Sequence, residues 1–233
     1  MGKKLFFSPQ INRQFIVIAS MVVSSVLCIS MLAIRIVHTQ RFTHTYLLWN
    51  LFLAWLPLVS ALISYNLHLS SPKRTWLLVI FCACLWLVFL PNAPYLITDL
   101  VHLHPGGEFI YWFDLIMFFA FAWNGIFLGL ISLYLMQELV DRVAGQLLSW
   151  GFVLIVSFLS SFGIYMGRFL RWNSWDLATQ PAELVGNLLD GVWHPYGHLR
   201  TLAFSLLFTL FLTSSYLMLV AVTRFNHVRP ERD

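Results

Sequence analysis

The sequence predicts an all-α, polytopic bundle of membrane-spanning helices. Of the 233 residues, 59% are hydrophobic and only 10% are charged, whereas soluble domains are about 25% charged. Six apolar stretches are long enough to cross a hydrocarbon layer of about 30 Å, which requires roughly 20 helical residues. Within one integral-membrane domain (residues 1–233), they cover approximately residues 15–34, 46–68, 76–97, 112–137, 147–170 and 201–223.

The basic residues predict which side of the membrane holds the termini. An even number of spans places both termini on one side. Of the fourteen Lys and Arg residues, nine lie in the termini and even-numbered loops, and five lie in the odd-numbered loops. By the positive-inside rule, the termini are expected in the cytoplasm. This distribution and attraction to anionic membrane lipids explain the net charge of +4, so no nucleic-acid partner is indicated.

The third span is predicted to be broken. Its uninterrupted apolar part, residues 76–90, would extend only about 22 Å as a helix. Pro91 and Pro94 follow, and because neither can donate a backbone hydrogen bond, the helix should break or kink near Asn92. Asn92 would then cap the N-terminus of the next helical segment. The alternative is a helix that simply ends at the membrane surface.

Polar residues after this break are predicted to share one face. On a helix counted from Asn92 at about 100° per residue, Tyr95, Asp99 and His102 fall within an arc of about 80°. Asp114 stands at the head of the fourth span, where a carboxylate is costly unless it is paired or hydrated. We therefore consider Asp99, His102 and Asp114 as candidate catalytic residues, and Asn92 and Tyr95 as candidate substrate-binding residues.

The fifth span carries a polar stripe that ends in two arginines. Arg168 and Arg171 share a helix face with three serines, Ser157, Ser160 and Ser161. One interpretation is structural, with the arginines paired to Asp99, Asp114 or Asp176. The functional interpretation is that they hold a phosphate or carboxylate group, because guanidinium binds such anions through two parallel hydrogen bonds.

In the fourth span, Gly125 and Gly129 form a G-x-x-x-G pair below Asp114. Small residues at this spacing allow a neighbouring helix to approach closely. We interpret this stripe as a packing seam.

The last outer loop contains an expected interfacial helix and weak metal-ligand candidates. Residues 181–191 begin with proline, end with glycine and place their apolar side chains together, as in a helix lying on the membrane surface. Trp172, before this helix, fits either a substrate platform or an interfacial aromatic belt. His194 and His198 have a zinc-compatible spacing, but the intervening proline and glycine argue against a helix there. The weak metal-ligand candidates are His102, His104, His194 and His198.

Three segments carry a resemblance to a known family. They read PNAPYLITDLVHL from Pro91, YWFDLIMFFAFAWNG from Tyr111 and GRFLRWNSWD from Gly167. Together they resemble an uncharacterised family of bacterial multi-pass membrane proteins, domain of unknown function 1361. The resemblance implies a protein of the bacterial cytoplasmic membrane, and it brings no established activity.

Three hypotheses for function follow from these residues. In the first, a membrane enzyme uses Asp99 or His102 at an outward-facing site, while Arg168 and Arg171 hold an anionic or lipid-linked substrate. In the second, a transporter or anion-binding protein uses the broken helix and the serine stripe. In the third, a structural or accessory protein uses its acids and arginines as ion pairs. No nucleotide-binding, dinucleotide, zinc-protease or serine-hydrolase motif occurs, and no cofactor is indicated.

Overall fold

The computed structural model describes residues 9–70, 74–103, 108–171 and 199–225, and all regular structure within these ranges is helical. Six segments are long and apolar enough to cross a membrane, so the predicted fold class is confirmed. The interfacial helix expected at residues 181–191 lies outside the described residues. The elements are α1 (Pro9–Thr39), α2 (Tyr46–Ser70), α3 (Trp76–Phe89), α4 (Asn92–Tyr95), the 3₁₀ helix η1 (Leu96–His102), α5 (Glu108–Ala144), α6 (Gln146–Phe169) and α9 (Leu199–Phe225).

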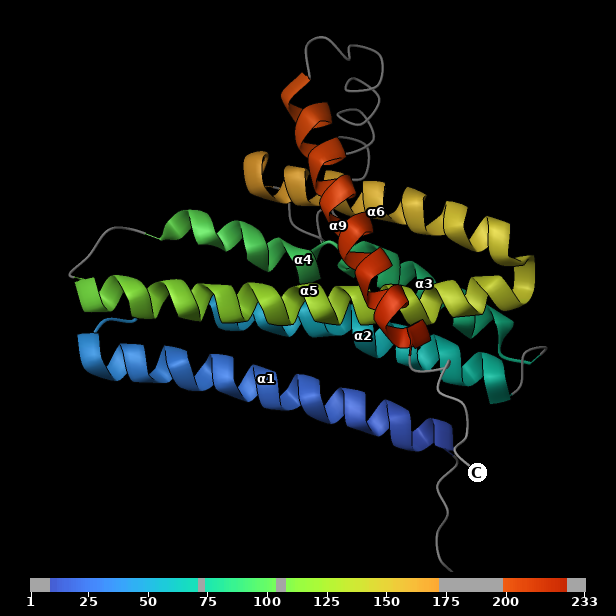
Figure 1. Cartoon of the computed structure of the whole chain (residues 1–233), viewed down its shortest axis with the longest axis horizontal. Coiled ribbons are helices and arrows are strands. Elements are labelled where there is room, and N and C mark those ends of the chain that lie inside the picture. Colours follow the sequence, from blue (N-terminus) through green and yellow to red (C-terminus); the bar gives the residue numbers. More distant parts are fainter. Residues whose placement is uncertain (1–8, 71–73, 104–107, 172–198, 226–233) are drawn as a thin grey trace, which may run out of the picture.

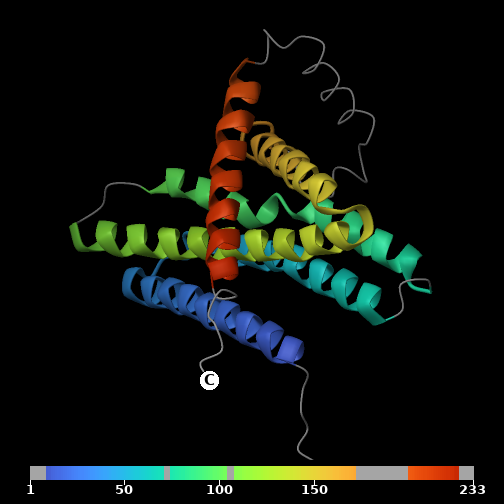
Figure 2. The same cartoon turned by 45° about the vertical axis from the view of Figure 1, so that its right-hand side comes forward.

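Helix α5 is the centre of the bundle. It packs against α1, α2, α4, η1, α6 and α9. Of the 18 consecutive residues that form its most apolar stretch, 61% are buried inside the bundle. The corresponding fraction is 17% for both α1 and α9, which therefore lie at the periphery. In both views α1, α2, α3 and α6 run roughly along α5, whereas α9 crosses it steeply (Figures 1 and 2).

The peripheral helix α1 is held to the bundle by a buried serine as well as by apolar contacts. The Ser25 hydroxyl oxygen accepts hydrogen bonds from Trp55 Nε1 on α2 at 3.0 Å and from Asn124 Nδ2 on α5 at 3.1 Å. Nearby, Cys28 and Leu32 of α1 are almost fully buried. One hydroxyl thus joins three helices in a region with no water to replace its partners.

The third span is broken, as the sequence predicts. Helix α3 ends at Phe89, α4 begins at Asn92 after two intervening residues, and the chain continues as η1. Because Pro94 has no N–H, the carbonyl of Leu90 lacks its usual donor four residues ahead. That carbonyl instead accepts the Ala93 N–H at 3.2 Å. The backbone therefore tightens locally, and the whole segment Trp76–His102 still forms one candidate span.

The role predicted for Asn92 is wrong. The N-cap position of α4 is occupied by Pro91, and no side-chain cap bond is present there. Asn92 Nδ2 instead donates to the carbonyl oxygen of Phe89 at 3.1 Å. The amide side chain satisfies a carbonyl at the end of α3, because the break deprives that end of backbone donors.

Glycines let α5 and α6 lie directly against the broken segment. A Cβ atom at Gly125 would collide with the carbonyl oxygen of Ala93 and would stand 2.7 Å from Leu96 Cδ1. A Cβ atom at Gly163 of α6 would stand 2.8 Å from Pro91 Cγ. The packing interpretation of the G-x-x-x-G pair is therefore confirmed, and its neighbour is the α4–η1 segment.

Replacement of Gly125 by Ala should destabilise the protein by about 1–3 kcal/mol, the usual cost of adding a methyl group to a filled core. The matched control is Gly151→Ala on α6, where an added Cβ would meet nothing within 4 Å. That change should be neutral or slightly stabilising, because alanine favours helix. Thermal unfolding of the detergent-purified variants measures both, and equal stability of the two would contradict the close packing of α4.

Candidate polar site

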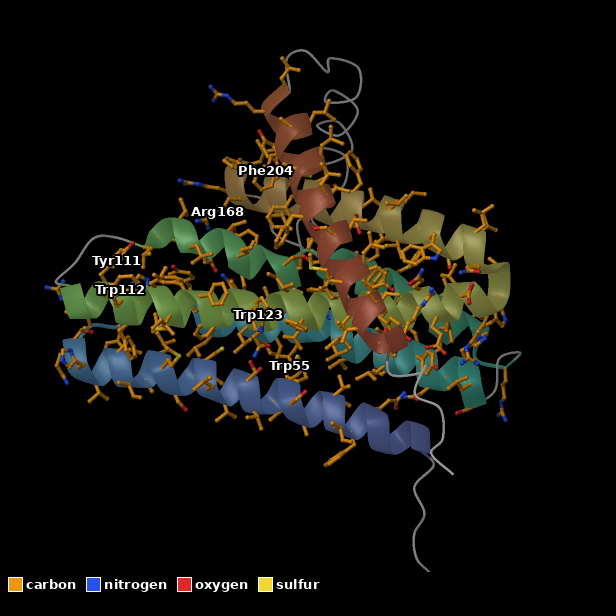
Figure 3. All side chains as sticks on the ribbon, in the orientation of Figure 1. Trp55, Tyr111, Trp112, Trp123, Arg168 and Phe204 are labelled. Carbon is orange, nitrogen blue, oxygen red and sulfur yellow. The ribbon has the colours of Figure 1, made fainter. Side chains whose placement is uncertain are left out.

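The guanidinium of Arg168 is the centre of a polar cluster at the end of α6. Its Nη1 donates to Asp99 Oδ1 at 3.2 Å and lies 3.4 Å from the Tyr95 hydroxyl, and its Nη2 is 2.9 Å from His102 Nε2. The guanidinium also lies over the Tyr95 ring, 5.9 Å from its centroid. The polar face predicted after the break is thus assembled around one arginine, next to the α4–η1 segment (Figure 3).

Asp99 is buried and held from two sides. Only 1% of the residue is exposed. Its Oδ1 accepts from Arg168, and its Oδ2 accepts from Asn50 Nδ2 on α2 at 2.9 Å. A carboxylate removed from water requires such partners, because its lost hydration must be replaced by charge and hydrogen bonds. Asn50 was not predicted to belong to the site.

The contact with Arg168 sets the tautomer of His102. Guanidinium stays protonated and can only donate, so His102 Nε2 accepts and carries no hydrogen. His102 is exposed, so it forms the side of the cluster that an incoming molecule would meet.

Two further residues, Tyr46 and His44, extend the cluster across the bundle end. The Tyr46 ring contacts the His102 ring edge to face at 5.7 Å, and the His44 ring at 6.0 Å. His44 in turn contacts Phe118 of α5 at 5.0 Å. Tyr46 was not predicted to belong to the site, because a tyrosine at the start of a span is usual for an interfacial aromatic residue.

Asp114 does not join the Arg168 cluster. Its carboxylate is bound bidentately by Arg35 of α1, with Nε–Oδ1 at 2.6 Å and Nη2–Oδ2 at 3.0 Å. Arg35 Nη1 also donates to the Thr43 hydroxyl at 2.5 Å. Both side chains of the ion pair are 11% exposed. Asp114 was expected to act beside Asp99 and His102. It instead forms a second ion pair, which joins α1 to α5.

The second predicted arginine, Arg171, is not among the residues that contact Arg168. Arg171 follows the end of α6 with a left-handed backbone (φ 58°) and an exposed side chain. Trp172, His104, His194 and His198 lie outside the described residues. Within the described ranges, no group of three or more His, Cys, Asp or Glu side chains is placed to hold a metal ion.

The fold and the cluster define a polytopic helical membrane protein with a buried acid–arginine pair near one end of its bundle. The chain belongs to the family described as "Protein of unknown function (DUF1361)", whose model matches residues 49–215. Comparisons with curated proteins and with solved structures find no match. The matched range includes Asn50, Asp99, His102, Asp114 and Arg168, and it leaves α1 with Arg35 outside.

Breaking the Arg35–Asp114 pair should be costly. Replacement of Arg35 by Ala leaves a largely buried carboxylate unpaired, and the expected loss of stability is about 3–5 kcal/mol. The double change Arg35→Leu with Asp114→Leu should recover most of that loss, because no charge stays unpaired. The control is Arg142→Ala, which removes a pair whose side chains are 44% and 33% exposed and should cost at most about 1 kcal/mol. Thermal unfolding distinguishes the three, and equal effects of Arg35→Ala and Arg142→Ala would contradict the assignment.

Proposed function

We propose that this chain binds the anionic group of a lipid-linked substrate at Arg168, on the outer face of a bacterial cytoplasmic membrane. In this proposal Asp99 positions Arg168, and His102 acts as the acid–base group. The observation that carries it is the single guanidinium that contacts a buried carboxylate on one side and an exposed imidazole on the other. Membrane lipids are the expected partners.

The geometry of Arg168 supports recognition of a phosphate. Asp99 is itself held by Asn50, so it can keep the guanidinium in place while other partners exchange. The exchangeable partner is His102, because it is the exposed member of the cluster. A phosphate oxygen that takes its place on Nη2 gains a charge-assisted hydrogen bond and releases Nε2 of His102 to accept a proton. The Tyr46 ring beside His102 provides a flat wall for the substrate.

The basic residues support the proposed orientation. Nine of the fourteen Lys and Arg residues lie in the termini and even-numbered loops, and five lie in the odd-numbered loops. Two of those five, Arg35 and Arg168, are paired with carboxylates inside the bundle. The positive-inside rule counts Lys and Arg whether or not they are paired, so the split of nine against five favours cytoplasmic termini.

A structural role is the second candidate, and the one-to-one pairing of charges favours it. Asp99 has Arg168, and Asp114 has Arg35. The two pairs connect η1 to α6 and α1 to α5, so they fix helices whose apolar surfaces alone would allow sliding. In this case the arginines need no ligand.

Substitution of Arg168 separates these two functions. If Arg168 binds a phosphate, Arg168→Lys should leave the fold intact but abolish stabilisation by anionic ligands, because lysine lacks the planar fork. Wild type should gain about 2.7 kcal/mol at a ligand concentration one hundred times its Kd. The measurement is a thermal-shift series with and without phosphatidylglycerol, a polyprenyl phosphate and inorganic phosphate.

The alanine variant provides the opposite test. In a purely structural role, Arg168→Ala leaves Asp99 buried and unpaired, with a loss of about 3–5 kcal/mol. If no anion shifts the wild type and Arg168→Ala fails to fold, the structural function is correct and the substrate-binding proposal is rejected. Arg171→Ala serves as the control, because its side chain is exposed and lies beyond the helix.

Labelling of single cysteines tests the orientation. In a background without Cys28, Cys82 and Cys84, a membrane-impermeant maleimide should react in intact cells with Gly106→Cys and not with Glu231→Cys. Reaction at position 231 alone would invert the topology and would place the Arg168 cluster at the cytoplasmic face. Permeabilised cells, in which both positions should react, provide the control for accessibility.

A further inference from the structure

A polar pocket lies at the end of the bundle opposite to the Arg168 cluster. Arg168 is in the last turn of α6, whereas the pocket is formed by the start of α6, the last turns of α5 and the end of α9. Its volume of about 110 Å³ is far more than the roughly 10–15 Å³ that holds one water molecule, so it can admit a group of several heavy atoms. Its walls include Glu138 and Asp141 of α5, Ser149 and Trp150 of α6, and Arg224 of α9.

This pocket contains opposite charges that do not pair with each other. The described residues form three ion pairs, and neither Asp141 nor Arg224 belongs to any of them. The Ser149 hydroxyl lies 3.5 Å from Asp141 Oδ1 and makes a shorter bond, of 2.9 Å, to the carbonyl oxygen of Gln146. The Asp141 carboxylate and the Arg224 guanidinium thus line one cavity, and neither is neutralised by the other.

Glu138 adds a second carboxylate to the pocket. Arg142 Nη2 and the Tyr65 hydroxyl both donate to its Oε1, at 2.6 and 3.0 Å, so Oε2 is left to accept from another donor. A metal ion would be repelled by the guanidinium of Arg224, and a simple anion would be repelled by the two carboxylates. The lining is therefore complementary to a ligand that carries an anionic group and a cationic group together.

The pocket lies at the level of the lipid headgroups. Residues 115–137 of α5 carry no charged side chain. As a helix they extend about 34 Å, close to the hydrocarbon thickness of about 30 Å. Glu138 and Asp141 follow directly after this stretch, at the depth where the charged groups of phospholipids begin. Trp150 in the pocket wall is a side chain typical of this interface.

We propose that this pocket binds a phosphoethanolamine group, with the phosphate on Arg224 and the ammonium on Asp141 and Glu138. The guanidinium fork matches two phosphate oxygens. A primary ammonium has three N–H donors, which two carboxylates can accept, whereas the quaternary ammonium of choline has none. The depth of the pocket makes the headgroup of phosphatidylethanolamine the expected source of this group.

Thermal unfolding of the full-length, detergent-purified protein tests the proposal with three short-chain lipids that differ only in headgroup. These are the dihexanoyl forms of phosphatidylethanolamine, phosphatidylcholine and phosphatidylglycerol. Phosphatidylethanolamine should stabilise wild type saturably, with an apparent affinity about tenfold or more above that of the other two, because it alone carries both a phosphate and a hydrogen-bonding ammonium. Free phosphoethanolamine distinguishes the source. Stabilisation by the lipid alone assigns a membrane lipid, and equal stabilisation by both assigns a soluble ligand.

Two substitutions assign the contacts. Asp141→Asn should remove most of the preference for phosphatidylethanolamine over phosphatidylcholine, because it weakens the ammonium site. Arg224→Gln should weaken the binding of both lipids by about tenfold, because both carry the phosphate. Both side chains are exposed, so the fold should be retained.

Arg74→Gln is the matched control, because Arg74 is exposed and does not line the pocket. Its lipid response should equal that of wild type. The response of Arg168→Lys to phosphatidylethanolamine should also be unchanged, so this site and the Arg168 site succeed or fail separately. An equal response of wild type to the three lipids would overturn the proposal, as would an unchanged preference in both pocket variants. If a variant unfolds, equilibrium binding of radiolabelled dihexanoyl phosphatidylethanolamine to wild type decides the question, and equal competition by the phosphatidylcholine form would reject the ammonium site.

Discussion

Two missing N–H groups, at Pro91 and Pro94, determine how the middle of this bundle is built. They stop α3 before it has crossed the membrane and turn the chain into a short α-helix and a 3₁₀ helix. A 3₁₀ helix has three residues per turn, so Asp99 and His102 lie one above the other. That register presents both side chains to the same arginine. The polar cluster is thus a consequence of the break, and the glycines of α5 and α6 make room for it.

The sequence was sufficient wherever the determining signal was local. Apolar length identified six spans, two prolines located the break, and helical spacing grouped Tyr95, Asp99 and His102. Arg168 could be added because it falls on the side predicted to face outward, where topology alone does not require a basic residue. These features depend on the backbone and on residues within a few turns of one another, so periodicity describes them well.

Long-range partners could not be predicted in the same way. Asp114 is bound by Arg35, which precedes it by 79 residues and was counted only as a topology signal. Asn50 and Tyr46 are single polar residues at the start of an apolar span, and nothing in their own neighbourhood marks them. Asn92 has the composition of an N-cap, but its amide is used at the end of the previous helix. In each case helix packing, which no single segment contains, selected the partner.

The Arg35–Asp114 pair also bears on the order in which the protein is made. Helix α1 is synthesised before α5, and the carboxylate that neutralises Arg35 follows 79 residues later. Until α5 is inserted, Arg35 must rest at the lipid headgroups, where its long side chain can reach water and phosphate. Capture by Asp114 then draws α1 against α5 and aligns Ser25 with its two donors. The ion pair therefore cannot form until α5 has been made, and the firm attachment of α1 to the bundle has to wait for a helix that comes much later in the chain.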